Sequence, residues 1–137
     1  MTVRYLETSA LLTWLFNEAA AQEVVDAINE ADLICPSELI RIETHRAIRR
    51  AFREEMITAD QYKDLKRLFE EKLRGWFRMS IDESVVYGSS VDFPLEPVRT
   101  LDAIHLATAL EYKKLYPEIE MITRDDRILR NRRALAL

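Results

Sequence analysis

The sequence predicts an α/β fold, a three-layer α/β/α sandwich with a central, mainly parallel sheet. Short apolar runs suited to buried strands alternate with longer stretches of helical periodicity, which is typical of a parallel sheet covered on both faces. The chain has 137 residues, of which 48% are hydrophobic and 32% are charged, enough for one domain with a sizeable core. No linker, repeat or low-complexity tract divides it. We therefore expect residues 1–137 to form a single domain.

The first half of the chain predicts a strand, two helices, a second strand and a long helix. In order, these are Val3–Leu6, Ala10–Phe16, Ala19–Ala31, Leu33–Cys35 and Ser37–Arg53. The first strand stops at polar residues whose hydroxyls can cap the next helix, and Pro36 ends the second strand. The long helix has an apolar stripe at helical spacing that includes Ile40 and Ile48.

The second half begins with the clearest helix start in the sequence. Thr58 and Gln61 form a capping box, and Ile57 can staple onto Tyr62, so a helix is predicted from Thr58 to Trp76. The next elements are a strand (Phe77–Ile81), a short helix opened by a Ser80–Glu83 capping box, and a proline-containing loop (Asp92–Arg99). After the loop we expect a helix (Leu101–Tyr116), a strand (Ile119–Thr123), a short helix capped by Asp125 and an edge strand (Ala134–Leu137).

Composition excludes several classes of protein. The chain has only two glycines, Gly75 and Gly88, too few for a Walker loop or a dinucleotide-binding fingerprint. One cysteine and two histidines cannot build a structural zinc site or a disulfide framework. No apolar run approaches the ~20 residues of a membrane span, and Glu7 interrupts the first apolar stretch before it could serve as a signal peptide. We expect a cytoplasmic protein with no membrane partner.

Four acidic residues stand where the predicted topology can gather them. Glu7 ends the first strand, Asp125 follows the last predicted interior strand, and Asp102 opens a helix, so all three fall at the rim where ligands collect in α/β sheets. Glu43 is inside a helix, about 60° from the buried Ile40 around the helix axis. Clustered carboxylates recruit a cation or raise one another's pKa, and an oxygen-only set suits Mg²⁺ or Mn²⁺. Each acid also has an ordinary explanation, as a helix cap, a strand end or a surface ion-pair partner.

Charge is distributed unevenly along the chain. The formal net charge is −4, which makes the protein a poor general binder of polyanions. Residues 41–53 nevertheless carry five arginines, and residues 124–133 carry five more. These clusters can bind phosphate, or they can be solvated helix faces. Arg46 and Arg50 lie on the side of the helix that carries Glu43, and Arg124 precedes Asp125, so we expect these three to guide a nucleic-acid backbone.

The short sequence motifs around the acids indicate a protein family more specifically than the acids themselves do. Residues 5–11 read YLETSAL, residues 99–109 read RTLDAIHLATA, and residues 122–127 read ITRDDR. These three segments, with Glu43 in the middle of a helix, resemble the motifs of PIN domains. In length and order, nearly the whole chain is similar to the small single-domain VapC toxins of toxin–antitoxin pairs.

This resemblance implies a metal-dependent endoribonuclease that cleaves RNA of the translation machinery, is blocked by a VapB-type antitoxin and forms a homodimer. It implies that the catalytic acids are Glu7, Glu43, Asp102 and Asp125. Among them, Glu7, Asp102 and Asp125 are expected to hold Mg²⁺ or Mn²⁺. Thr8 and Thr123 are expected to support the site, and Asp126 is the reserve for Asp125.

One residue departs from the family pattern: Glu7 stands where aspartate is usual. Its extra methylene moves the carboxylate by roughly 1–1.5 Å if the backbone stays fixed, and positional errors of about 1 Å can reduce a rate by about 10²-fold. We expect an active site with adjusted coordination. The alternative is a PIN-like module that binds RNA or protein without turnover. A receiver-type phosphotransfer domain is disfavoured, because Glu7 stands alone and Arg124, not lysine, follows Thr123.

Two further expectations concern single elements. His105 is expected to be a packed helix residue and not a catalyst. The aromatic and leucine-rich helix Thr58–Trp76, with the helix before it, is expected to form an arm that receives an amphipathic antitoxin helix.

Overall fold

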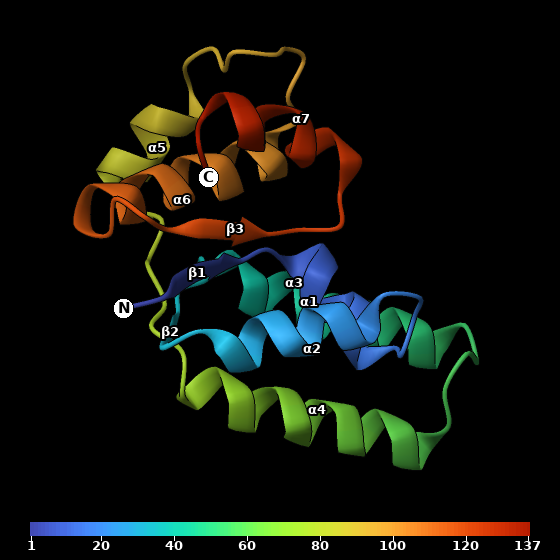
Figure 1. The fold of residues 1–137 in the computed structure, drawn as a ribbon. Helices are drawn as coiled ribbons and strands as arrows, with labels where there is room; N and C mark the ends of the chain where they lie inside the picture. Colours follow the sequence, from blue (N-terminus) through green and yellow to red (C-terminus); the bar gives the residue numbers. More distant parts are fainter.

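The computed structural model describes residues 1–137 as seven helices and a three-stranded sheet (Figure 1). The elements follow one another as β1 (Val3–Leu6), α1 (Thr8–Leu15), α2 (Ala21–Glu30), β2 (Leu33–Ile34), α3 (Leu39–Arg53), α4 (Ala59–Arg74), α5 (Glu83–Ser89), α6 (Thr100–Leu115), β3 (Glu120–Ile122) and α7 (Asp126–Ala134). None of the helices is long and apolar enough to cross a membrane.

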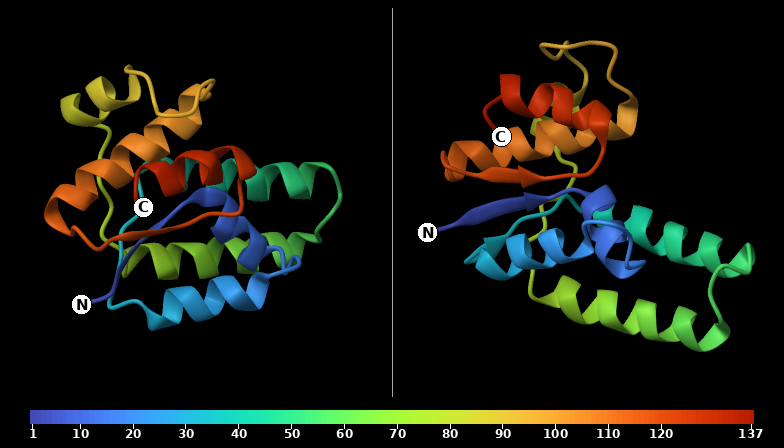
Figure 2. Two further views of the ribbon diagram at one scale, coloured as in Figure 1. Left: turned by 45° about the horizontal axis from the view of Figure 1, so that its top comes forward. Right: turned by 45° about the vertical axis from the view of Figure 1, so that its right-hand side comes forward.

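The sheet has the order β2-β1-β3, and both of its strand pairs are parallel. Helices α1 to α4 lie on one side of it and α5 to α7 on the other (Figures 1 and 2). The predicted three-layer α/β/α sandwich is therefore confirmed. Because all strands run the same way, their carboxyl ends open at the same edge of the sheet.

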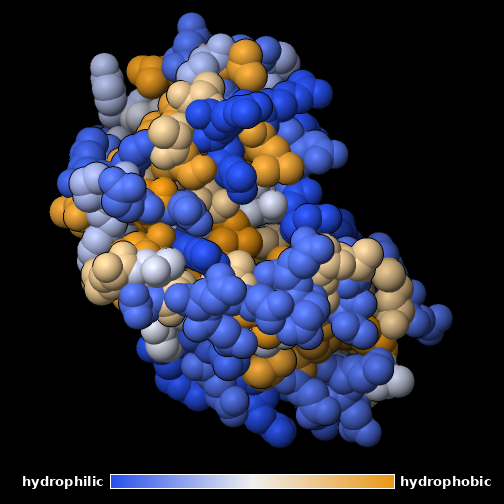
Figure 3. Space-filling view, in the orientation of Figure 1, coloured by the Kyte–Doolittle hydropathy of each residue, from blue (hydrophilic) through white to orange (hydrophobic).

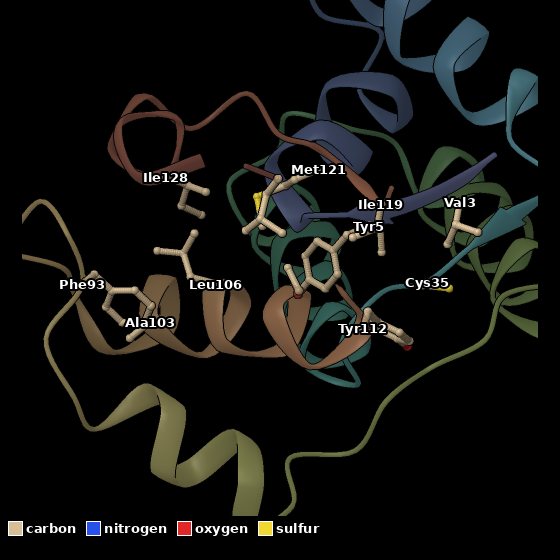
Figure 4. Close-up of a cluster of buried hydrophobic side chains, with 12 residues drawn as sticks. Val3, Tyr5, Cys35, Phe93, Ala103, Leu106, Tyr112, Ile119, Met121 and Ile128 are labelled. Carbon is tan, nitrogen blue, oxygen red and sulfur yellow. The ribbon is translucent and has the colours of Figure 1, made fainter. Parts of the chain in front are cut away.

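Successive side chains of each strand point to opposite faces of the sheet, so a hydrophobic core forms on each face. Tyr5 and Met121 point toward α6 and α7, whereas Leu6 belongs to the core built with α1 to α4. Figure 4 shows the first of these cores, in which Leu106 from α6 and Ile128 from α7 point toward one another beside Met121 of the sheet. Both faces are thus sealed by apolar side chains, which is the requirement for a buried parallel sheet.

Local capping explains where the helices begin. Thr58 and Gln61 form the predicted capping box at the start of α4, and Asp125 caps α7. The Glu7 carboxylate accepts a hydrogen bond from the backbone of Ser9 and so starts α1 two residues earlier than predicted. The predicted cap Ser80 is wrong, because α5 is capped by Asp82, whose side chain accepts from the backbone of Val85.

Two predicted strands are absent. The segment Phe77–Ile81 makes only a single bridge, between Met79 and Ser37, and the neighbouring Pro36 has no N–H with which to extend that pairing. The segment Ala134–Leu137 is not an edge strand, because its backbone N–H groups donate to carbonyls of α7 as the helix ends. The outer edge of β3 is instead contacted by Arg132, whose guanidinium donates to the carbonyl of Met121 at 3.1 Å.

Candidate active site

A cavity of about 410 Å³ lies at the carboxyl edge of the sheet. All four predicted catalytic acids line it, together with a set of arginines from α3 and from the loop before α6. Its polar and charged lining residues are Glu7, Thr8, Ser9, Glu43, Arg46, Arg49, Arg50, Arg53, Arg99, Asp102 and Asp125. In Figure 3, hydrophilic side chains border the recess on the right-hand side, the side toward which β1 and β3 run in Figure 1. The expected convergence of the four acids on one cavity is therefore present.

Glu7 is held firmly at the end of β1. Its Oε2 accepts hydrogen bonds from the backbone N–H of Ser9 at 3.0 Å and from the hydroxyl of Thr123 at 2.7 Å, and it also accepts from the Ser9 hydroxyl. The residue is only 5% exposed. Oε1 takes no hydrogen bond and lies 4.0 Å from Nε2 of His105. The extra methylene of the glutamate thus lets one oxygen reach its anchors while the other stays unpaired.

Glu43 is anchored through one oxygen as well. Its Oε1 accepts from the hydroxyl of Thr8 at 2.7 Å and contacts Nε2 of His105 at 2.6 Å. Its Oε2 takes no hydrogen bond from the protein, and the side chain is 24% exposed. An ion pair with Arg46 on the helix surface, which would have been the ordinary explanation of Glu43, is absent. Glu43 lines the cavity instead.

Behind Glu43, Tyr5 and His105 form a buried pair. The phenol oxygen of Tyr5 lies 2.6 Å from Nδ1 of His105, and the ring of His105 is 1% exposed. Burial, reinforced by the charge of Glu7, raises the pKa of Tyr5 well above its ordinary value of 10.0, so the phenol keeps its proton. A carboxylate can only accept, whereas a phenol can donate or accept. The assignment that satisfies both contacts therefore puts the ring proton on Nε2, which donates to Glu43, and leaves Nδ1 to accept from Tyr5.

Asp102 is the acid whose carboxylate receives the least stabilisation from neighbouring donors and positive charges. It sits in the first turn of α6, and its Oδ2 is buried without any hydrogen-bond partner. The nearest cation is the guanidinium of Arg99, whose Nε is 3.6 Å from that oxygen and whose side chain is 64% exposed. A buried carboxylate oxygen without a donor is unfavourable unless another group completes its surroundings. The orphaned oxygen therefore marks the place where a cation would be stabilised.

Asp125, and not Asp126, faces the cavity. Asp125 caps α7 through the backbone N–H of Arg127 at 2.8 Å and pairs with the guanidinium of Arg127 at 3.3 Å. Partial burial alone would raise the pKa of Asp125, but the hydrogen bonds and charge of Arg127 outweigh it and lower the pKa from 3.8. Asp126 is exposed and does not line the cavity. The predicted spacing thus selects the first of the two aspartates.

The donor set fits magnesium or manganese better than zinc. Unpaired oxygens of Glu7, Glu43 and Asp102 line the cavity, which contains no thiolate, and Nε2 of His105 is engaged with Glu43. No three acidic or histidine side chains lie close enough together to enclose an ion by themselves. Magnesium commonly takes one or two protein carboxylates and completes its shell with water and substrate phosphate. The residues present fit an ion of that kind, and the predicted ligands Glu7, Asp102 and Asp125 stay a prediction.

The predicted RNA-binding arginines divide into two groups. Arg46 and Arg50 line the acidic cavity, and they are joined there by Arg49, Arg53 and Arg99. Arg124 is exposed and lines a different hollow, between α2 and β3, together with Arg4 and Arg132. Its backbone N–H donates to the Ser9 hydroxyl, so residue 124 supports the site through its main chain.

Sequence reasoning missed three contributors to the site. Ser9 binds Glu7, His105 binds Glu43, and Arg99 stands beside Asp102. His105 was expected to be packed in a helix, and this is confirmed, but its hydrogen bond to Glu43 was not anticipated. The signal available in the sequence was its position three residues after Asp102, one turn further along the same face of α6.

The fold and the acid-lined cavity define a small α/β nuclease-like domain, and comparison with known proteins agrees. The chain belongs to the PIN-domain family, whose profile matches residues 4–134. It is also similar to Ribonuclease VapC35 of Mycobacterium tuberculosis, with 31% identity over 135 residues in each of strains CDC 1551/Oshkosh and ATCC 25618/H37Rv. The alignment covers 97% of this chain and 92% of the relative. The resemblance to VapC toxins is therefore confirmed over nearly the whole chain.

Proposed function

We propose that this protein is a VapC-type toxin that hydrolyses phosphodiester bonds in RNA with the help of Mg²⁺ or Mn²⁺. The observation that carries the proposal is the cavity in which four carboxylates are bordered by five arginines. Arginines draw in a phosphate backbone, while the carboxylates repel it unless a divalent cation stands between them. Family membership and the similarity to a ribonuclease support the same activity.

Each group of residues in the cavity has a separate role in the proposed reaction. Glu7, Asp102 and Asp125 would hold the cation, which when bound activates water and stabilises charge on a phosphate. The free Oε2 of Glu43 can accept a hydrogen bond from the attacking water and orient it toward phosphorus. Arg46 and Arg50 bind the non-bridging oxygens of the phosphates on either side of the scissile bond. We further propose RNA of the translation machinery as substrate and the cytoplasm as the site of action, on the strength of the likeness to VapC.

The direct test is RNA cleavage by protein purified free of antitoxin. With a fluorescent RNA and Mn²⁺ we expect cleavage that EDTA abolishes and that Asp102→Asn reduces by about 100-fold or more. Asp126→Asn is the matched control, because Asp126 is the neighbouring exposed acid outside the cavity, and it should keep wild-type activity. Equal cleavage in Mn²⁺, in EDTA and by Asp102→Asn would exclude a metal-dependent mechanism at this site.

A second function is favoured by the way Glu7 is bound. Because Oε2 of Glu7 is occupied by Ser9 and Thr123, the cavity could bind RNA or a protein without cutting. This alternative, a PIN-like binding module, predicts RNA binding with no turnover in the same assay and a gain of cleavage in Glu7→Asp. Turnover by the wild-type protein would rule it out.

We propose that a VapB-type antitoxin binds in the apolar groove that leads away from the cavity. The groove has a volume of about 800 Å³ and lies between the end of α1, the end of α3 and the start of α4. It shares Leu12, Ala47 and Arg50 with the acidic cavity, so a partner helix seated there reaches the site. The antitoxin was expected to dock on the whole helix Thr58–Trp76 and the helix before it; we now propose that, on α4, it contacts only the amino-terminal half. Trp76 is partly buried against the core and does not line this groove.

The antitoxin site can be tested with two exposed apolar residues. Met56 lines the groove and is 72% exposed, whereas Leu115 is 63% exposed and lies outside it. We expect Met56→Glu to weaken antitoxin binding at least tenfold and Leu115→Glu to leave it unchanged. Equal effects of the two substitutions, measured by titration calorimetry, would place the partner elsewhere.

We also propose a homodimer. Apolar side chains on α5 and the loop after it are exposed, namely Val86, Tyr87, Val91 and Leu95, and contiguous exposed apolar patches commonly mark interfaces. Tyr87→Glu should shift sedimentation equilibrium toward a monomer. A wild-type protein that is monomeric at the highest concentration studied would refute the dimer.

A further inference from the structure

We propose that His105 is a positioning residue for Glu43: the Nε2–H of its imidazole fixes one carboxylate oxygen so that the other faces the cavity. The proposal rests on the function proposed above, in which Glu43 orients the attacking water.

The imidazole of His105 is fixed at both nitrogens. Nδ1 accepts from the phenol of Tyr5 at 2.6 Å, and Nε2 lies 2.6 Å from Oε1 of Glu43. The ring is 1% exposed, and Tyr5 is fully buried. A buried ring with a hydrogen bond at each end cannot rotate without leaving two buried polar groups unpaired. Its direction is therefore set by the core and not by the solvent.

The ring favours one acid over the other. Nε2 is 2.6 Å from Oε1 of Glu43 but 4.0 Å from Oε1 of Glu7, and the second distance is beyond hydrogen-bond range. Glu7 has its own donors in Ser9 and Thr123. Of the two acids, His105 therefore binds only Glu43; its one other contact at Nε2 is the hydroxyl of Thr8, at 3.4 Å.

Packing by itself does not account for this arrangement. A leucine of similar size would fill the space without any polar group to satisfy, whereas the imidazole needs two partners in a buried setting. Here one of the two partners is an acid that lines the cavity, and its second oxygen has no protein donor. The hydroxyl of Thr8 is the other donor to Oε1, at 2.7 Å. Without His105, that single flexible contact would have to hold the carboxylate.

The kinetic test uses a matched pair of substitutions. The amide nitrogen of glutamine can take the place of Nε2 and still donate to Glu43, while the shorter asparagine reaches only the position of Nδ1. We expect His105→Asn to lower kcat by about 10- to 100-fold, as removal of a group that orients a catalytic ligand typically does, with KM for RNA changed less than twofold. His105→Gln should recover most of the lost kcat. Equal losses in both variants, or wild-type kcat in His105→Asn, would overturn the proposal.

A second measurement does not depend on cleavage or on the variants of His105 folding. In ¹⁵N-histidine-labelled protein, we expect a slowly exchanging Nε2–H signal for His105. This signal should shift in Glu43→Gln and stay in place in Asp102→Asn, which changes an acid one turn away on the same helix. A ring whose Nε2 carries no proton, or a signal unmoved by Glu43→Gln, would overturn the proposal. If these spectra appear as expected in a protein that cuts no RNA, the proposed function fails and the hydrogen bond stands.

Discussion

Glu43 on α3 and His105 on α6 are joined by a hydrogen bond of 2.6 Å, although 62 residues separate them in the chain. The two helices lie on opposite faces of the sheet (Figures 1 and 2), so the bond connects the outer layers past the end of β1. Thr8, at the start of α1, donates to the same oxygen of Glu43. Glu43 is therefore held by contacts that also join the layers of the fold.

The orphaned oxygen of Asp102 leads to a prediction about stability. Asp102→Asn removes a largely buried charge that has only the exposed Arg99 nearby, and burying an amide is less unfavourable than burying a carboxylate. We expect the free energy of unfolding without metal to rise by about 1 kcal/mol. Mn²⁺ should stabilise the wild-type protein and have no effect on the variant.

Urea unfolding with and without Mn²⁺ measures both effects. Asp126→Asn serves as the control, since its exposed carboxylate lies outside the cavity. Equal stabilisation of all three proteins by Mn²⁺ would contradict a role of Asp102 in holding the cation.

The hydroxyl of Thr123 is predicted to be essential for holding Glu7. It donates to Oε2 of Glu7 at 2.7 Å and accepts from the backbone N–H of Asp125 at 3.1 Å. Thr123→Val keeps the shape but removes both bonds, so we expect a loss of about 1–3 kcal/mol in the free energy of unfolding and weaker cleavage. Thr123→Ser keeps the hydroxyl and should lose less than half as much. The comparison requires chemical denaturation of both variants, and similar losses would show that only the methyl group matters.

The arginines of the cavity are predicted to bind RNA through phosphate. Arg46→Ala and Arg50→Ala should raise KM with kcat nearly unchanged. Each should reduce the slope of log K against log salt concentration by about 0.7, the value for one phosphate of a single strand. Arg41→Ala is the control on the same helix, because Arg41 pairs with Glu38 and does not line the cavity.

Arg124 makes this experiment more discriminating. It lies in the second cluster of arginines in the sequence but lines a different hollow, so Arg124→Ala should leave the salt slope unchanged if RNA follows α3. A loss equal to that of Arg50→Ala would mean that the RNA path crosses the edge of β3 as well.

The pairing of Asp125 with Arg127 predicts a pH dependence of stability. Because the pKa of Asp125 is lower in the fold than the ordinary 3.8, the ionised carboxylate stabilises the native state. This contribution is complete above pH 3.8 and is lost as the pH falls through the lower pKa of the folded state. Arg127→Gln should move the pKa of Asp125 upward, which a carbon-detected NMR titration of the carboxyl group can follow. Arg130→Gln, on the same helix but outside this pair, should leave it unchanged; a shift of the same size would assign the effect to general charge.

Most elements of this fold were predictable from the sequence because their signals are local. The capping box of Thr58 and Gln61 and the cap at Asp125 are formed within three residues of chain, and β1 has the predicted bounds. The two missing strands had suitable apolar residues, yet strand formation depends on a partner's free backbone groups. Pro36 has no N–H to pair with the segment Phe77–Ile81. In the segment Ala134–Leu137, the backbone N–H groups already donate to carbonyls of the last turn of α7.

The candidate site was predictable in its four acids but not in its atomic arrangement. The sequence by itself determined which four acids to expect, namely Glu7, Glu43, Asp102 and Asp125, because the motifs around them resemble those of PIN domains; their positions alone left ordinary explanations open. Only the tertiary structure decided which oxygen of each acid is anchored, that His105 serves Glu43, and that Arg124 faces away. Those outcomes depend on distances between residues from different layers, and such distances are fixed by how helices pack across a sheet and not by neighbours along the chain.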